Sequence, residues 1–168
     1  MIIMGIDPGT AAIGYGAIKK NTMSNSKQEL QIIDFGCIRT SKQLDASERL
    51  KKLYQQLNKI IKKINPKIIA VEEIFFFKNL KTAIKVSQAR GVILLAASQK
   101  KIPVCEYTPL QVKQAVVGYG RAEKKQIQKM VKFILKLKTT PKPDDAADAL
   151  ALAICCAHST KFNFKNKI

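Results

Sequence analysis

The chain has 168 residues, 46% of them hydrophobic and 25% charged, which is the size and composition of one globular domain. No run of 18 apolar residues is present, which excludes an obvious transmembrane helix, and the N-terminal apolar run lacks the basic flank of a secretory signal, so we expect a cytoplasmic protein. Thirty basic against twelve acidic residues give a net charge of +18. This charge favours a polyanionic partner such as nucleic acid, although lysines that only decorate solvated faces would give the same number.

Three N-terminal segments show the short apolar pattern of β-strands and are joined by short links, which predicts an antiparallel meander. They are residues 2–7, 13–17 and 30–38. Apolar residues then recur at helical spacing from Leu50 to Ile64. Asp45 and Glu48 are spaced as a capping box that would open this helix.

The second half of the chain alternates between strand and helix patterns. A buried strand at 68–71 ends in two acids, and a strand at 103–107 follows a helix over 81–100. Further helices are expected from Thr108 to a break at Gly118, over 123–137, and over 144–157 with Asp144 as the N-cap. The order predicts an α/β fold with one five-stranded mixed sheet and helices on both faces. We expect a single domain over 1–158 and a short basic tail at 159–168.

The four cysteines predict neither a disulfide nor a zinc site. Cys37 and Cys105 are isolated, Cys155 and Cys156 are adjacent within an apolar segment, and no C-x-x-C pair occurs. The only histidine is His158, so a structural zinc ion has almost no ligand set. We interpret all four cysteines as reduced core residues.

Acids are scarce in this chain, so their positions are informative. Asp7 ends the first strand and Glu72 ends the fourth, while Asp145 and Asp148 lie three residues apart near the start of the last helix. Sites in open α/β sheets form outside the carboxyl ends of the strands, and residues three apart share one face of a helix. We therefore predict that these four carboxylates come together. Glu73 follows Glu72 directly and should point to the opposite face.

Clustered carboxylates predict a metal site, because like charges this close repel unless a cation neutralises them. Magnesium prefers oxygen ligands, and two such ions about 4 Å apart can activate water and stabilise a leaving oxygen in phosphodiester cleavage. Each acid also has a simpler explanation: a turn for Asp7, the helix dipole for Asp145, solvent for Asp148. The joint occurrence of all of them in a basic chain favours a metal-dependent nuclease.

Several ordered motifs resemble the RuvC family of bacterial Holliday-junction resolvases, and the similarity covers residues 1–158. These motifs are Met4-Gly5-Ile6-Asp7-Pro8-Gly9-Thr10, Gly14-Tyr15-Gly16, Ala70-Val71-Glu72-Glu73-Ile74-Phe75, Ser87-Gln88-Ala89-Arg90-Gly91-Val92, Gln111-Val112-Lys113-Gln114, Val117-Gly118, Ala122-Glu123-Lys124 and Asp145-Ala146-Ala147-Asp148-Ala149-Leu150-Ala151. A D-x-G-T segment alone also occurs in sugar kinases and actin-like ATPases, whereas the complete ordered set is specific.

The resemblance implies an RNase H-like fold, a homodimer, and an endonuclease that makes paired, symmetric nicks in four-way DNA junctions during recombination and repair. It implies Mg²⁺, with Mn²⁺ as a substitute and two ions per site, and RuvA and RuvB as branch-migration partners. The resemblance implies that Asp7, Glu72, Asp145 and Asp148 are catalytic and bind the metal. It also implies that Lys113 and Lys124 have catalytic roles near the scissile phosphate. Glu73 departs from a common glutamine, and Asp145 stands where some relatives have histidine.

We expect DNA contacts from one aromatic residue, which would meet junction bases, and from basic residues. They are Phe75, Lys78, Lys81, Lys85, Arg90, Lys113, Arg121 and Lys124. Phe76 and Phe77 are better interpreted as core residues, and the helix at 81–100 is the expected dimer surface. The alternatives are another RNase H-like structure-selective nuclease, a non-catalytic junction-binding protein, or a D-x-G-T ATPase, which would normally need a longer, duplicated chain.

Overall fold

The computed structural model describes residues 1–9, 12–22, 28–73 and 80–159. Its elements follow the predicted order. The strands are β1 (Ile2–Asp7), β2 (Ala12–Thr22), β3 (Gln28–Arg39), β4 (Ile68–Glu72) and β5 (Val104–Tyr107); the helices are α1 (Ala46–Ile64), α2 (Leu80–Gln99), α3 (Pro109–Val117), α4 (Lys124–Ile134) and α5 (Asp144–Ser159). No helix within these residues is long and apolar enough to cross a membrane.

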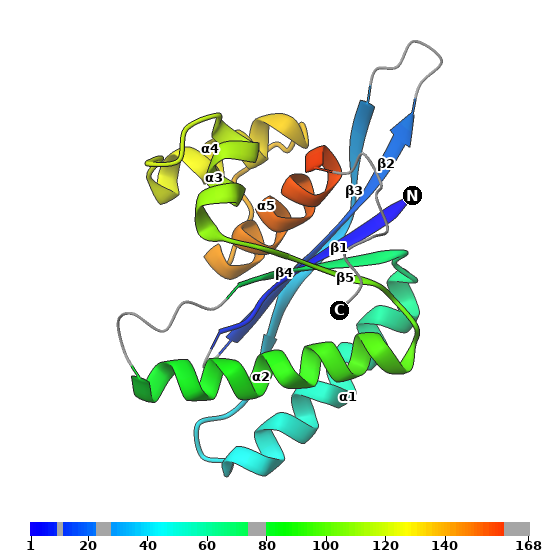
Figure 1. Cartoon of the computed structure of the whole chain (residues 1–168), viewed down its shortest axis with the longest axis vertical. Helices are drawn as coiled ribbons and strands as arrows, with labels where there is room; N and C mark the ends of the chain where they lie inside the picture. The colour runs from blue at the N-terminus through cyan, green and yellow to red at the C-terminus, as the bar shows by residue number, and fades with distance from the viewer. Residues whose placement is uncertain (10–11, 23–27, 74–79, 160–168) are drawn as a thin grey trace.

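The five strands form one mixed sheet in the order β3-β2-β1-β4-β5. β1, β2 and β3 are antiparallel neighbours, as the predicted meander requires, and β4 and β5 join parallel to β1 and to one another. Figure 1 shows α3, α4 and α5 on one face of the sheet and α1 and α2 on the other. The predicted α/β architecture with both faces covered is therefore confirmed.

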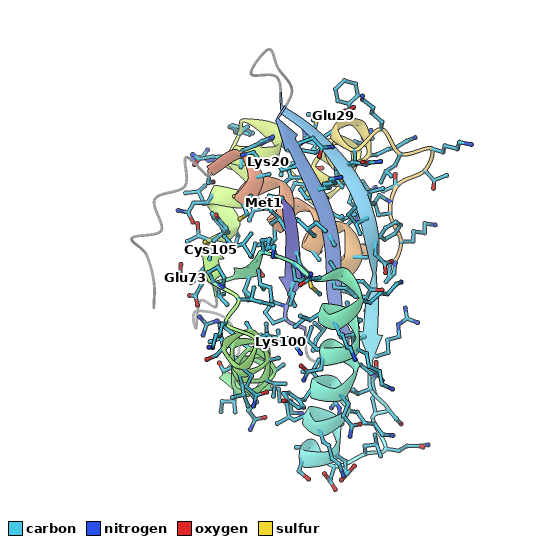
Figure 2. The ribbon with its side chains drawn as sticks, turned by 90° about the vertical axis from the view of Figure 1, so that its right-hand side faces the viewer. Met1, Lys20, Glu29, Glu73, Lys100 and Cys105 are labelled. Carbon is cyan, nitrogen blue, oxygen red and sulfur yellow. The ribbon has the colours of Figure 1, made fainter. Side chains whose placement is uncertain are left out.

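Side-chain alternation along the central strands divides the interior into two cores. Ile3 of β1 and Ile68 of β4 pack toward α5, whereas Met4 and Ile69, the next residues, pack toward α1 and α2. The ends of the sheet are also fixed. The Met1 ammonium donates to the Lys20 carbonyl at 2.9 Å, and Figure 2 shows these residues together at the end of the sheet where β1 begins.

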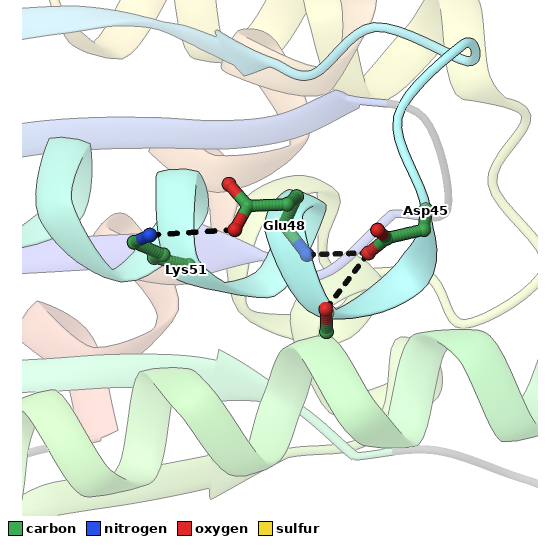
Figure 3. A network of polar contacts seen from close by, with 4 residues as sticks. Asp45, Glu48 and Lys51 are labelled. Atoms are coloured by element: carbon green, nitrogen blue, oxygen red, sulfur yellow. Dashed lines mark hydrogen bonds and ion pairs between the residues drawn. The ribbon is translucent and has the colours of Figure 1, made fainter.

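Helix boundaries agree with the sequence at several ends. Asp45 caps α1, and its carboxylate accepts from the Glu48 N–H at 2.8 Å (Figure 3). The predicted capping box is only half present, because the Glu48 carboxylate accepts from Lys51 at 3.3 Å. Thr108 caps α3 in a full capping box with Gln111, and Gly118 ends it at φ 78°.

Several predicted boundaries are wrong. The strand expected over 13–17 continues to Thr22, and two helix ends also differ. The helix expected to reach residue 137 ends at Ile134, because Lys136 adopts φ 51° and the Leu137 N–H donates to the Lys132 carbonyl at 2.9 Å. This is a left-handed helix stop, so the later prolines are not needed to end it. Asp144, expected as the N-cap, is instead the first residue of α5. The Ala146 N–H donates to the Pro143 carbonyl, so the helical turn starts one residue earlier than expected.

Candidate active site

The carboxyl edge of the sheet places two acids side by side. β1 and β4 are parallel, with Ile6 opposite Val71. The next residues, Asp7 and Glu72, are the last of their strands and therefore lie side by side at the edge of the sheet. Ile6 and Val71 both belong to the core under α1 and α2. Alternation therefore directs Asp7 and Glu72 to the α5 face.

Glu73 is exposed, and its N–H donates to the Tyr107 carbonyl at 2.9 Å. It lies at the side of the sheet next to β5, as Figure 2 shows. The backbone of Glu73 thus continues the pairing of β4 with β5, one residue after Glu72, which faces α5. The predicted preference for Glu72 over Glu73 agrees with this geometry.

Glycines in β1 and β2 bring α5 to the same edge. A Cβ atom on Gly5 would lie 1.9 Å from the Ala149 carbonyl oxygen, and one on Gly14 would lie 1.9 Å from the Asp145 carbonyl oxygen. The helix backbone therefore rests directly on the strands, where any larger residue would push it away. This close approach carries the acids of α5 to the strand ends that hold Asp7 and Glu72.

A pocket of about 220 Å³ opens between these elements. Three acids and two lysines supply its polar lining: Asp7, Glu72, Asp148, Lys113 and Lys124. Its walls are largely apolar and come from α3, α4 and α5: Pro109, Val112, Ile127, Ala151 and Leu152. The apolar walls keep water from surrounding the acids, and the two lysines are the cations within reach of an anionic ligand in the pocket.

The fourth predicted acid does not line this pocket. Asp145 lies one turn before Asp148 on α5 and is half-buried, with its Oδ2 3.9 Å from Cys37 Sγ. Its charge still raises the pKa of Asp7, although less than those of Glu72 and Asp148 do. The structure thus groups three of the predicted acids and leaves Asp145 at the margin.

The electrostatics of the pocket disfavour ionised carboxylates. Burial first, and then the charges of Glu72 and Asp148, raise the pKa of Asp7 from 3.8 to about 7. Burial and Asp148 also raise the pKa of Glu72. Desolvation and like charge both raise the pKa values of these carboxyl groups, so a bound cation would favour their ionised forms.

Lys124 is the cation that contacts the acids of α5. Its Nζ is 2.9 Å from Asp148 and 3.6 Å from Asp144. Burial raises the pKa of Asp148, and Lys124 opposes that rise without cancelling it. Burial lowers the pKa of Lys124, but its hydrogen bonds and ion pairs with Asp148 and Asp144 together outweigh burial and leave the pKa raised. One half-exposed lysine does not neutralise the pocket, which leaves unbalanced negative charge for a further cation.

The residues of the pocket fit magnesium, which usually takes one or two protein carboxylates and completes its shell with water and substrate phosphate. Among the described residues, no three His, Cys, Asp or Glu side chains converge closely enough to form a cage for a metal. The pocket therefore suits an ion shared with a phosphate better than a closed structural metal site.

The predicted DNA-binding residues occupy different places. Lys113 and Lys124 line the pocket, and Arg121 is exposed between α3 and α4. Arg90 is half-buried and forms an ion pair with Glu106 of β5, which ties α2 to the sheet. Lys85 lies on the opposite face. The remaining predictions lie outside the described residues: the DNA contacts of Phe75, Lys78 and the Lys81 side chain, and the core positions of Phe76 and Phe77.

Two contributors were missed in the sequence. Cys37 contacts Asp145 from β3, and nothing in its local sequence indicates this, because the pairing of Gly14 with Cys37 is a property of the sheet register. Burial and then Asp145 raise the pKa of this thiol, which keeps it protonated. The role of Gly5 and Gly14 as the seat of α5 was also missed, although glycines at alternate strand positions are a recognisable signal of close packing.

An RNase H-like sheet with a desolvated acidic pocket at its carboxyl edge, in a chain of net charge +18, defines a nuclease. The family model for the crossover junction endodeoxyribonuclease RuvC matches residues 3–156. RuvC from Halothermothrix orenii is 53% identical over 165 residues, covering 98% of this chain and 97% of that protein. The chain belongs to the RuvC family.

Solved structures agree with this assignment. The Thermus thermophilus RuvC structure aligns with a TM-score of 0.86 at 36% identity and covers 94% of both chains. T. thermophilus RuvC in complex with a Holliday junction substrate aligns with a TM-score of 0.84 at 34% identity, again covering 94% of both chains. The predicted RNase H-like fold and the resemblance to RuvC are confirmed.

Proposed function

We propose that this chain is a magnesium-dependent endonuclease that resolves four-way DNA junctions by paired nicks. The observation that carries the proposal is the pocket in which Asp7, Glu72 and Asp148 are desolvated together within a strongly basic protein. A protein that only binds a polyanion gains nothing from holding carboxylates against it. Family membership narrows the substrate from DNA to the four-way junction.

Asp7, Glu72 and Asp148 would hold the metal, with Asp145 contributing from the margin of the pocket. When bound, Mg²⁺ or Mn²⁺, as one or two ions, supplies the positive charge that activates water and stabilises the leaving oxygen. Asp7 has a pKa of about 7, so without such a charge it holds a proton for much of the time near neutral pH. Lys124 holds Asp148 by an ion pair of 2.9 Å, and Lys113 faces the acids from α3, where it can bind the scissile phosphate.

A homodimer through α2 is the second part of the proposal. Ile84 and Leu95 are large apolar side chains on this helix, 55% and 52% exposed, and a Cβ atom on Gly91 between them would meet nothing within 4 Å. Ile84, Gly91 and Leu95 are separated by seven and four residues, the spacing of one face of a helix–helix seam. Pairing two α2 helices would cover this stripe and give the two symmetric sites that paired nicking requires.

The dimer is tested by sedimentation of the full chain. Leu95→Glu should shift the protein to the monomer, because it buries a charge in the seam. Phe133→Glu is the matched control, since Phe133 is 77% exposed on α4 and lies outside the seam. A Leu95→Glu protein with the wild-type sedimentation coefficient would contradict the α2 interface. We further propose that the enzyme acts in the cytoplasm with RuvA and RuvB as partners, a proposal that its membership of the RuvC family supports.

The enzymatic proposal is tested with a synthetic four-way junction, linear duplex of the same sequence, wild-type protein and Asp7→Asn. Wild type should nick the junction at paired positions with Mg²⁺ or Mn²⁺ and remain inactive in excess chelator. Asp7→Asn should bind the junction without cutting it. Equal cutting of duplex and junction would favour a less selective RNase H-like nuclease, and junction binding with no cutting by wild type would indicate a non-catalytic binding protein.

A further inference from the structure

A second pocket lies at the same edge of the sheet but on the face covered by α1 and α2. Its volume is about 300 Å³, larger than that of the acidic pocket. The turn after β1, the start of β2, the end of β3 and the segment after it, the start of α1, and residues 85–89 of α2 enclose it. Its floor consists of core residues that are buried or half-buried: Ile13, Ile38, Leu50, Leu53 and Ala89.

The lining of this pocket is cationic. Lys42, Arg49 and Lys85 line it together with Thr40 and Gln88, and no carboxylate is among the described residues of the lining. These groups come from three separate segments of the chain. A lysine-rich surface alone does not explain them, because they converge on one concavity with an apolar floor.

Asp45 and Glu48, the acids next to lining residues of α1 in the sequence, already have partners. Asp45 Oδ1 accepts from the Glu48 N–H and from Ser47 Oγ, both at 2.8 Å, and Glu48 pairs with Lys51 at 3.3 Å. Figure 3 shows this network at the start of α1. The hydrogen bonds to Asp45 keep its pKa low, so it remains charged as a helix cap. These acids therefore have partners of their own outside the pocket lining.

Among the three basic residues of the pocket, the Arg49 side chain is held in position by a hydrogen bond. Its side chain is half-buried, and Nε donates to Thr40 Oγ1 at 3.1 Å, which fixes the plane of the guanidinium. A planar guanidinium matches the oxygens of a phosphate better than a mobile ammonium does. Lys42 and Lys85 are exposed and can close on such an anion from either side.

We propose that this pocket binds a non-scissile backbone phosphate of the DNA, with its sugar over the apolar floor, while the acidic pocket holds the phosphate that is cut. The inference rests on the proposed function. Asp7 and Gly9, two residues apart, each line one of the two pockets, so DNA crossing this edge meets both. The positive pocket would add affinity for the strand outside the reaction centre, as phosphate contacts in other protein–DNA complexes do.

The test compares two double variants for binding and cutting of a synthetic four-way junction. Lys42→Gln with Lys85→Gln removes both mobile cations from the pocket. Lys59→Gln with Lys62→Gln removes the same charge from exposed positions on α1 that do not line it. Binding is measured in chelator, so that wild type does not cut, and cleavage is measured with Mg²⁺ at saturating protein.

Each lost phosphate contact lowers the slope of log affinity against log salt by about 0.9. The proposed dimer would lose one contact in each of its two pockets, so the pocket variant should lose nearly 2 from the slope. Its affinity deficit relative to wild type should then shrink about tenfold between roughly 50 and 200 mM salt. The control should keep the wild-type slope, and both variants should cut bound junction at nearly the wild-type rate. Arg49→Lys should keep the slope but weaken binding, because charge is retained and the planar fork is lost.

Equal slopes for the pocket and control variants would overturn the inference, while junction cutting by wild type would leave the proposed function intact. A slope loss with a matching collapse of the cleavage rate of bound DNA would also overturn it, because the contact would then lie at the scissile phosphate. Thermal protection by a free mononucleotide, with unchanged junction slopes, would assign the pocket to a small molecule and overturn the inference as well. Failure of wild type to bind the junction at all would overturn both proposals.

Discussion

The two faces of the sheet carry opposite charge at the same edge. On the α5 face, burial first and then the charges of Glu72 and Asp148 raise the pKa of Asp7 to about 7. On the α1 and α2 face, Lys42 and Arg49 line a pocket whose described residues include no carboxylate. Alternation along β1 and β4 directs the acids to the α5 face, whereas Lys42 and Arg49 reach the other face from the segment after β3 and from α1. One sheet edge can therefore hold a cation beside one phosphate and bind another phosphate directly.

The sharpest test of this separation is the adjacent pair Glu72 and Glu73. Glu72→Gln removes a carboxylate from the pocket and should slow junction cleavage by roughly a thousandfold, the equivalent of several kcal/mol of transition-state stabilisation. Glu73→Gln should stay within about twofold of wild type, because its side chain is exposed and faces away. Single-turnover cleavage of the junction measures both rates. A large loss in the Glu73 variant would contradict the assignment of faces.

The next prediction concerns the close packing of α5 against Gly14 of β2, which brings the acids of α5 to the edge of the sheet. Gly14→Ala would place a Cβ 1.9 Å from the Asp145 carbonyl oxygen, a backbone atom that cannot rotate away. We expect a loss of about 3 kcal/mol in unfolding free energy, or roughly 10 °C in Tm. Gly36→Ala is the control, since its closest neighbour would be the Tyr15 hydroxyl at 2.9 Å, a side-chain atom that can shift. Thermal denaturation should separate the two, and equal losses would show that α5 is not seated on Gly14.

Lys124 is the cation that belongs to the acidic face, and its removal should have a smaller effect on cleavage. Lys124→Gln should slow cleavage of bound junction by about tenfold to a hundredfold, the range of a hydrogen bond to a charged group. Stability should change by less than about 1 kcal/mol, because the lysine side chain is 52% exposed. Lys125→Gln is the neighbouring exposed control. Equal rates for the two variants would mean that the ion pair to Asp148 has no role in the reaction.

The pH dependence of stability should report the crowded acids directly. The pKa of Asp7 is about 7 in the folded protein against an ordinary value of 3.8, so between about 4 and 7 the folded state holds a proton that the unfolded chain has released. Stability of the metal-free protein should therefore fall as pH rises through this window, and the raised pKa values of Glu72 and Asp148 act in the same direction.

Melting curves at pH 6 and pH 8 measure this dependence, with and without Mg²⁺. Magnesium should stabilise the protein more at pH 8 than at pH 6, because it competes with the proton on Asp7. Asp7→Asn should weaken both the fall with pH and the magnesium effect. A metal-free protein whose Tm rises from pH 6 to pH 8 would contradict the desolvated pocket.

Local sequence was sufficient to predict the fold and much of the site. The periods of two and 3.6 residues predicted every strand and helix, and alternation after Val71 favoured Glu72 over Glu73. The two helix ends were predicted wrongly because local backbone conformation sets them. Lys136, in the left-handed conformation, ends α4 early, and a turn closed by the Pro143 carbonyl starts α5 one residue before the position expected from an Asp144 cap. Residue type does not indicate these conformations strongly; a lysine at positive φ, for example, is uncommon.

The sequence by itself determined the acids, their positions at strand ends, and a basic chain around them. Only the tertiary structure decided which acids share a pocket, because that depends on how closely α5 rests on Gly5 and Gly14. The same packing leaves Asp145 against Cys37 at the margin. The cationic pocket was beyond sequence reasoning altogether, because Lys42, Arg49 and Lys85 converge only when α1 and α2 pack on the far face of the sheet. Periodic burial is encoded locally, whereas convergence of distant side chains arises from packing.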